Sequence, residues 1–119
     1  MKVLLDTNFL IDIVKFRVNL ESLYGLTGAH ELATLSSVIR ELNRLSKQNS
    51  RTGGYARVAL RLIKELGIEI LKSESRPDEA FMKLTDDIVA TNDVELRKRL
   101  KALGKKTIYL KSKKHLAIG

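Results

Sequence analysis

The chain alternates short apolar runs with longer stretches in which apolar residues recur every three or four positions. The short runs are typical of buried strands and lie at 2–6, 32–36, 68–71, 88–90 and 107–110. The longer stretches are typical of amphipathic helices and lie at 8–15, 19–26, 37–46, 55–66, 78–84 and 94–103. Gly67 and Gly104 follow two of these stretches and are expected to end them, and residues 46–54 form the clearest loop.

Strands that alternate with helices at this spacing predict an α/β fold, a three-layer α/β/α sandwich around a mostly parallel sheet. A chain of 119 residues is expected to form a single domain, residues 1–119. In sheets of this kind, sites lie beyond the carboxyl ends of the strands, where the strand order reverses. The residues that follow each predicted strand are therefore the candidates for a site.

Carboxylates and small polar side chains follow three predicted strands and open one predicted helix. They are Asp6, Thr7 and Asn8; Ser37 and, one turn on, Glu41; Asp78 and Glu79 at the start of a helix; and Thr91, Asn92 and Asp93. Taken singly, each is a common helix cap or first-turn residue, and Asp6 or Thr7 is suited to cap the helix at 8–15. Four acidic positions at one sheet edge repel one another unless a cation is bound. They predict an Mg²⁺ or Mn²⁺ site, because hard ions prefer oxygen ligands.

Charge and composition narrow the choice of partner and compartment. The net charge is +8, and residues 96–119 hold nine basic residues and no acidic one. Such a basic element suits a polyanionic partner, with nucleic acid first and a membrane surface second. The alternative without a partner is a solvated basic helix followed by a basic tail. The chain has no cysteine, which excludes disulfides and thiolate metal sites. It has no apolar run of membrane-spanning length and no leader pattern, so a cytoplasmic location is expected.

Acids that bind a metal, next to basic residues that bind a phosphate backbone, predict a nuclease. The two histidines, His30 and His115, lie away from the acidic positions, so the pattern requires no histidine base. The residues expected to contact RNA are Arg40, Arg44, Arg97, Lys98, Arg99 and Lys101.

Three segments together resemble the PIN domain family of Mg²⁺/Mn²⁺-dependent ribonucleases: LLDTNFLID, SSVIREL with Glu41, and VATNDVELRKRLKALGKKTIYL. The last looks closest to the branch of the small-subunit ribosome-assembly endonuclease and its small archaeal relatives, while VapC-type toxins are more distant. The resemblance covers nearly the whole chain. It implies an endoribonuclease with RNA as its substrate and rRNA processing as its role. It implies that Asp6, Glu41, Glu79 and Asp93 bind the metal, supported by Thr7, Asn8, Ser37, Thr91 and Asn92.

The third acid of the family opens the helix before the strand at 88–90, and here the choice between Asp78 and Glu79 is open. This helix is about one turn shorter than in the family, and Asp86 and Asp87 are assigned to the turn that follows it. A catalytically degenerate RNA-binding or ribosome-assembly module and a VapC-type toxin are therefore the alternatives. A phosphotransfer domain is disfavoured, because Asn8 stands where such sites carry an acid. A homodimer is expected from the resemblance, and an antitoxin-like or ribosome-assembly partner is left open.

Overall fold

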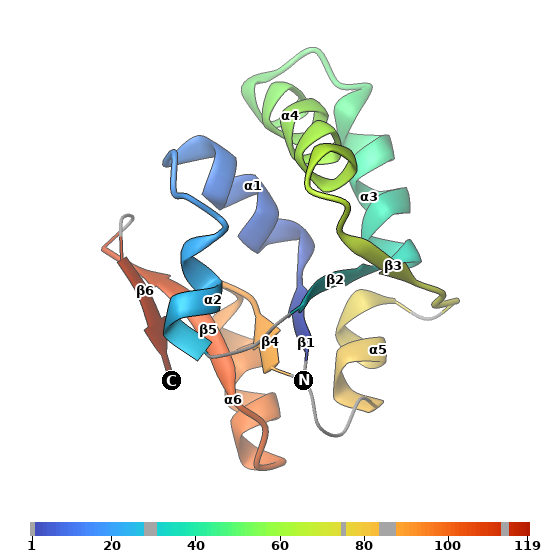
Figure 1. Ribbon diagram of the computed structural model, residues 1–119. Coiled ribbons are helices and arrows are strands. Elements are labelled where there is room, and N and C mark those ends of the chain that lie inside the picture. The colour runs from blue at the N-terminus through green and yellow to red at the C-terminus, as the bar shows by residue number, and fades with distance from the viewer. Residues whose placement is uncertain (1, 28–30, 75, 84–87, 113–114) are drawn as a thin grey trace.

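The computed structural model describes residues 2–27, 31–74, 76–83, 88–112 and 115–119. A six-stranded sheet with the order β3-β2-β1-β4-β5-β6 runs through the middle of the molecule (Figure 1). Its strands are β1 (Lys2–Leu5), β2 (Glu31–Leu35), β3 (Glu69–Leu71), β4 (Ile88–Ala90), β5 (Thr107–Lys111) and β6 (His115–Ile118). Neighbouring strands pair in parallel except β5 and β6, which are antiparallel. The predicted α/β fold with a mostly parallel sheet is confirmed.

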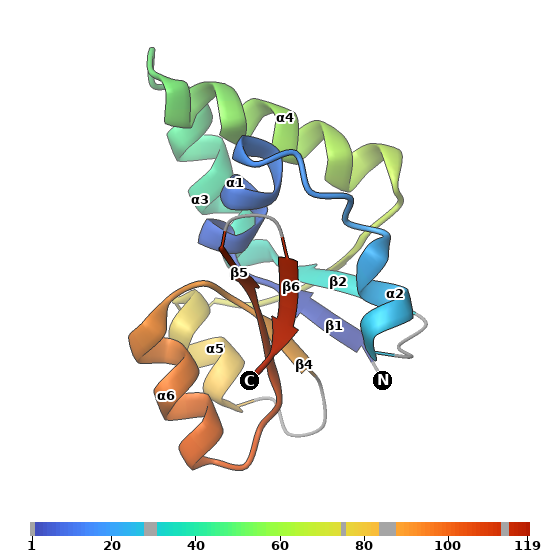
Figure 2. The same cartoon turned by 90° about the vertical axis from the view of Figure 1, so that its left-hand side faces the viewer.

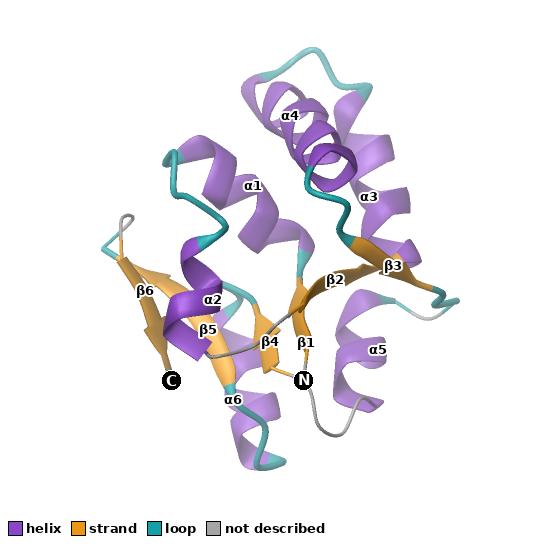
Figure 3. Ribbon diagram, viewed as in Figure 1, coloured by secondary structure: helices purple, strands orange, loops and turns teal. Residues whose placement is uncertain are grey.

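Helices cover both faces of this sheet. They are α1 (Thr7–Lys15), α2 (Ser22–Thr27), α3 (Ser36–Ser46), α4 (Arg51–Glu65), α5 (Pro77–Lys83) and α6 (Val94–Ala102). Helices α1, α3 and α4 pack together on one side, and α5 and α6 lie on the other (Figures 2 and 3). Within the described residues, no helix has both the length and the apolar character needed to cross a membrane.

The two-sided cover explains why the central strands have continuous apolar runs rather than an alternating pattern. Val3, Leu4 and Leu5 of β1 are fully buried, as is Val89 of the neighbouring β4. The side chains of β1 therefore pack into both layers of the core.

Two features differ from the sequence-based expectations. Strand β6 was not predicted, because its short HLAI segment follows a basic run and becomes a strand by pairing along β5. Helix α4 begins at Arg51, four residues before its predicted start, with Ser50 as its cap accepting a hydrogen bond from the Gly53 amide at 3.1 Å. A Cβ at Gly53 would overlap the Gln48 carbonyl oxygen, so this glycine marks a close approach of two backbone segments rather than a loop.

The two predicted helix ends are confirmed. Gly67 and Gly104 follow α4 and α6 with φ angles of 62° and 77°, a conformation that favours glycine. After each glycine the chain folds back on the helix, since the Ile68 amide bonds to Ile63 O and the Lys105 amide to Leu100 O, both at 3.0 Å.

Candidate active site

The candidate site lies at the topological switch point, where the strand order of the sheet reverses. From β1 the chain adds β2 and β3 on one side, then crosses to place β4 and β5 on the other. The carboxyl ends of β1 and β4 therefore flank the switch point, with Leu5 paired to Ala90. The Asp6 amide extends this pairing by donating to the Ala90 carbonyl at 2.9 Å. The two similar motifs, Asp-Thr-Asn at 6–8 and Thr-Asn-Asp at 91–93, thus meet side by side.

Asp6 is buried, with an exposed fraction of 5%. Its Oδ1 accepts a hydrogen bond from the Thr7 amide at 2.8 Å, which makes Asp6 rather than Thr7 the cap of α1. Its Oδ2 accepts one from the Thr91 hydroxyl at 2.7 Å. Capping and participation in a site are therefore not alternatives here, because the two carboxylate oxygens have different partners.

Thr91 joins the acids of the two motifs. Its fully buried side chain donates to Asp6 and accepts from the Asp93 amide at 3.2 Å. Asp93 caps α6 through Oδ1, which accepts from the Leu96 amide at 3.1 Å. One threonine hydroxyl therefore links the Asp6 carboxylate to the backbone that carries Asp93.

Asn92, in the loop between β4 and α6, is bonded to both α1 and β5. Its amide donates to Asn8 Oδ1 at 3.2 Å, its Nδ2 donates to Asp12 Oδ2 at 2.9 Å, and its Oδ1 accepts from the Leu110 amide at 2.8 Å. Asp12 was not among the site residues expected from the sequence. The available signal was its position one turn after Asn8, on the same face of a largely apolar helix.

Reversing the Asn92–Asp12 pair tests this bridge. Asn92→Asp sets two carboxylates against each other, and we expect it to lower the free energy of unfolding by ~1–3 kcal/mol at neutral pH. Adding Asp12→Asn restores a donor opposite an acceptor, so the double variant should recover most of that loss in urea denaturation. A double variant that is no more stable than Asn92→Asp would contradict the bridge.

Glu41 lies on α3, the helix that follows β2, and is half-buried. Ser36, at the start of this helix, exchanges two hydrogen bonds with Ser73: its hydroxyl donates to Ser73 O at 3.0 Å and accepts from the Ser73 amide at 2.7 Å. Arg40 Nη2 donates to the same carbonyl at 2.7 Å. These bonds fix the loop after β3 at the edge of the sheet where the Asp6 motif lies.

The two candidates for the third acid, Asp78 and Glu79, follow this loop in the chain. Helix α5 begins at Pro77, and the Glu79 side chain is exposed. The Asp78 side chain lies outside the described residues, as do Asp86 and Asp87. Across the described part of the chain, no three Asp, Glu or His side chains come close enough to bind one metal ion together. The convergence of four acids on one ion therefore stays a prediction.

Comparison with known proteins identifies the family. Residues 3–113 match the family model described as a PIN like domain. The chain belongs to this family. It is 31% identical over 126 residues to Ribonuclease VapC4 of Methanocaldococcus jannaschii, covering 98% of this chain and 95% of that protein. The solved structure of the PIN domain endonuclease Utp24 superposes with a TM-score of 0.80 over 98% of this chain and 90% of that one, and its 24% identity shows a shared fold.

The donor set of this PIN domain suits a hard divalent cation. Its candidate ligands are carboxylate, hydroxyl and amide oxygens. Thr7 Oγ1 and Ser37 Oγ, each in the first turn of a helix at this edge, are buried with no hydrogen-bond partner among the described residues. Mg²⁺ commonly uses one or two carboxylates and completes its shell with water and phosphate oxygens, so unpaired hydroxyls in the first turns of α1 and α3 would suit a hydrated ion.

The basic residues expected to bind RNA fall into two groups. Arg40, Arg44, Lys98, Arg99 and Lys101 are exposed, and Arg40 is also bonded to the Ser73 carbonyl. Arg97 is half-buried, and its guanidinium carbon lies 3.5 Å from the centroid of the Tyr109 ring. The sequence did not distinguish it from its neighbours on α6.

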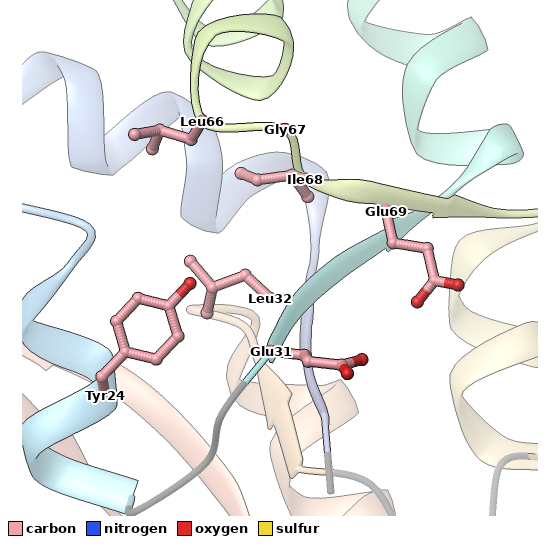
Figure 4. Close-up of a pocket in the computed structure, with 7 residues that line it drawn as sticks. All are labelled: Tyr24, Glu31, Leu32, Leu66, Gly67, Ile68 and Glu69. Carbon is pink, nitrogen blue, oxygen red and sulfur yellow. The ribbon is translucent and has the colours of Figure 1, made fainter.

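A hollow of about 420 Å³ opens at the amino ends of β2 and β3, at the edge opposite the acidic motifs (Figure 4). Its lining comprises Tyr24, Glu31, Leu32, Leu66, Gly67, Ile68 and Glu69. The charged side chains among these are two glutamates, and Lys2 Nζ is paired to Glu69 Oε1 at 2.6 Å. This hollow is therefore unsuited to a phosphate backbone.

Proposed function

We propose that this PIN domain is an endoribonuclease that hydrolyses RNA phosphodiesters with bound Mg²⁺ or Mn²⁺. The observation that carries the proposal is the joining of the Asp6 and Asp93 motifs through the Thr91 hydroxyl at the switch point of the sheet. The relatives named as a ribonuclease and as a PIN domain endonuclease support the same activity.

In this proposal Asp6 and Asp93 hold the metal together with Glu41, and Asp78 or Glu79 completes the set. Thr91 orients the Asp6 carboxylate by donating to Oδ2, and the two helix caps hold Oδ1 of each aspartate. A bound divalent ion supplies an activated water and neutralises charge on the phosphodiester. The Thr7 and Ser37 hydroxyls provide donors for water or a phosphate oxygen, and the basic residues of α6 hold the RNA backbone.

Removing the metal tests the activity directly. With end-labelled single-stranded RNA, we expect cleavage in Mn²⁺ or Mg²⁺, loss of cleavage when a chelator is added, and recovery when metal is restored in excess. The dependence follows because the clustered carboxylates would repel each other and an anionic phosphodiester unless a divalent cation neutralises the charge. Cleavage that persists in the chelator, or none with any divalent ion, would contradict the proposal.

An RNA-binding module with a degenerate acidic site is the second candidate. The exposed Glu79 side chain and the absence of a three-acid group among the described residues favour it. Calorimetric titration with Mn²⁺ separates the two, because a nuclease site should bind the ion and lose that binding in Asp93→Asn. No Mn²⁺ binding by the unaltered protein would favour the degenerate module.

For the biological role, we place rRNA processing first and a VapC-type toxin second. The TND-x-ELRKRL segment supports the former, and the 31% identity to Ribonuclease VapC4 supports the latter. The corresponding partner would be a ribosome-assembly factor or an antitoxin. In either role we propose that the protein is a cytoplasmic homodimer. Comparing cleavage of precursor ribosomal RNA with that of unrelated RNA of equal length separates these roles.

A further inference from the structure

Arg97 differs from the other basic residues of α6 in being held in place. Its guanidinium stacks on Tyr109 at 3.5 Å from the ring centroid, and its Nε is buried without a hydrogen-bond acceptor in the described part of the molecule. Gly119 lies against the same pair, since a Cβ there would come 3.0 Å from Tyr109 Cε1 and 3.5 Å from Arg97 Nη2. Lys98 and Arg99, the next residues on the helix, are exposed.

The stacked pair belongs to the backbone that builds the acidic site. Arg97 lies one turn after Asp93, and its amide donates to the Asp93 carbonyl at 3.0 Å. Tyr109 stands between two residues bonded to the same motif: the Ile108 carbonyl accepts from the Thr91 amide at 2.9 Å, and the Leu110 amide donates to Asn92 Oδ1 at 2.8 Å. The backbone segments that carry the stacked pair are therefore bonded to the Thr91–Asp93 motif, and the stack on Tyr109 restricts the guanidinium.

No acidic side chain among the described residues forms an ion pair with Arg97. Among the described residues, the ion pair present joins Lys2 to Glu69. A stacked tyrosine offsets part of the lost hydration and leaves the outer N–H groups available. A planar guanidinium matches the oxygens of a phosphate and binds them in a bidentate manner. Because the stack has already restricted the side chain, little entropy is lost when such a partner binds.

We propose that Arg97, positioned by Tyr109, is the principal phosphate-binding residue beside the acidic site, and that Lys98, Arg99 and Lys101 add a weaker, screened attraction. This inference rests on the proposed function, because it takes RNA as the ligand. Tyr109 acts through Arg97 and is a positioning residue. A purely structural stack, which only attaches α6 to β5, is the alternative that the experiment must separate.

The experiment measures the binding of labelled single-stranded RNA by fluorescence anisotropy over a range of salt concentrations. All variants are made in the Asp6→Asn protein, so that binding is measured without cleavage. Arg97→Ala is expected to raise Kd ~10-fold or more and to lower the salt slope by ~0.7. The matched control Arg99→Ala removes the same charge from the same helix and should change Kd less than ~3-fold.

Three further variants separate positioning from folding. Tyr109→Leu removes the ring but keeps an apolar side chain and should weaken RNA binding, whereas Tyr109→Phe should bind as the parent does. Arg97→Lys retains the charge and the helix but should still weaken binding, because an ammonium cannot make the bidentate contact. Circular dichroism of each variant confirms that it is folded.

Equal effects of Arg97→Ala and Arg99→Ala, or unaltered binding by Arg97→Lys or Tyr109→Leu, would overturn the inference. Strong RNA binding that depends on Arg97, in a protein that cleaves no RNA with any divalent ion, would uphold the inference and contradict the nuclease. An Asp6→Asn protein that binds no RNA at any salt concentration would overturn the inference whatever its parent cleaves.

Discussion

Asp6→Asn is expected to lower the rate of RNA cleavage by on the order of 10²-fold or more while leaving the protein folded. The substitution removes a negative charge at the switch point of the sheet without changing the size of the side chain. Asparagine is as good a helix cap as aspartate, so the bond from the Thr7 amide to Oδ1 can be kept. The bond from the Thr91 hydroxyl to Oδ2 can be replaced by one that the asparagine Nδ2 donates to the hydroxyl oxygen. The loss should therefore appear in the cleavage rate and in Mn²⁺ affinity rather than in stability.

The measurement compares initial cleavage rates in Mn²⁺ with urea denaturation of the same preparations. Glu95→Gln is the matched control, because Glu95 is an exposed acid in the first turn of α6, two residues from Asp93, and takes part in none of the hydrogen bonds described above. It removes the same charge and should cleave at the rate of the parent. Equal cleavage by Asp6→Asn and the parent protein would remove Asp6 from the catalytic site.

Phe81→Ala is expected to lower the free energy of unfolding by ~3–5 kcal/mol, a large part of the ~5–15 kcal/mol typical of a domain. Phe81 is fully buried, and no other described side chain of α5 is buried to this extent. Its removal leaves a cavity beneath a seven-residue helix whose other apolar contacts with the core come from the half-buried Ala80 and Met82. Urea denaturation measures the loss.

The control for this prediction is Met82→Ala on the same helix. Met82 is half-buried, so its truncation should cost about half as much. Phe81→Ala should also speed amide hydrogen exchange in residues 77–83 more than elsewhere, because the helix loses its buried anchor. This matters for the site because α5 carries Asp78 and Glu79. A loss below ~1 kcal/mol, or an equal loss in both variants, would show that α5 is not anchored through Phe81.

Much of the architecture was predictable from local patterns. The runs at 2–6 and 88–90 became the central strands because a parallel sheet covered on both faces needs continuous apolar segments. Gly67 and Gly104 marked helix ends because their φ angles are costly for other residues. Strand β6 was not predictable, since a short edge strand depends on the partner along which it pairs.

For the site, the sequence by itself determined which residues follow each strand, and therefore that Asp6 and Asp93 would face one sheet edge. Tertiary structure alone decided that β1 and β4 are neighbours, that the Thr91 hydroxyl joins their two motifs, and that Asp12 pairs with Asn92. It also decided that Arg97 stacks on Tyr109 while Lys98 and Arg99 stay exposed. The physical reason is that strand ends and helix caps depend on near neighbours in the chain, whereas strand order and side-chain contacts join residues as far apart as Asp6 and Thr91 and form only when the core packs.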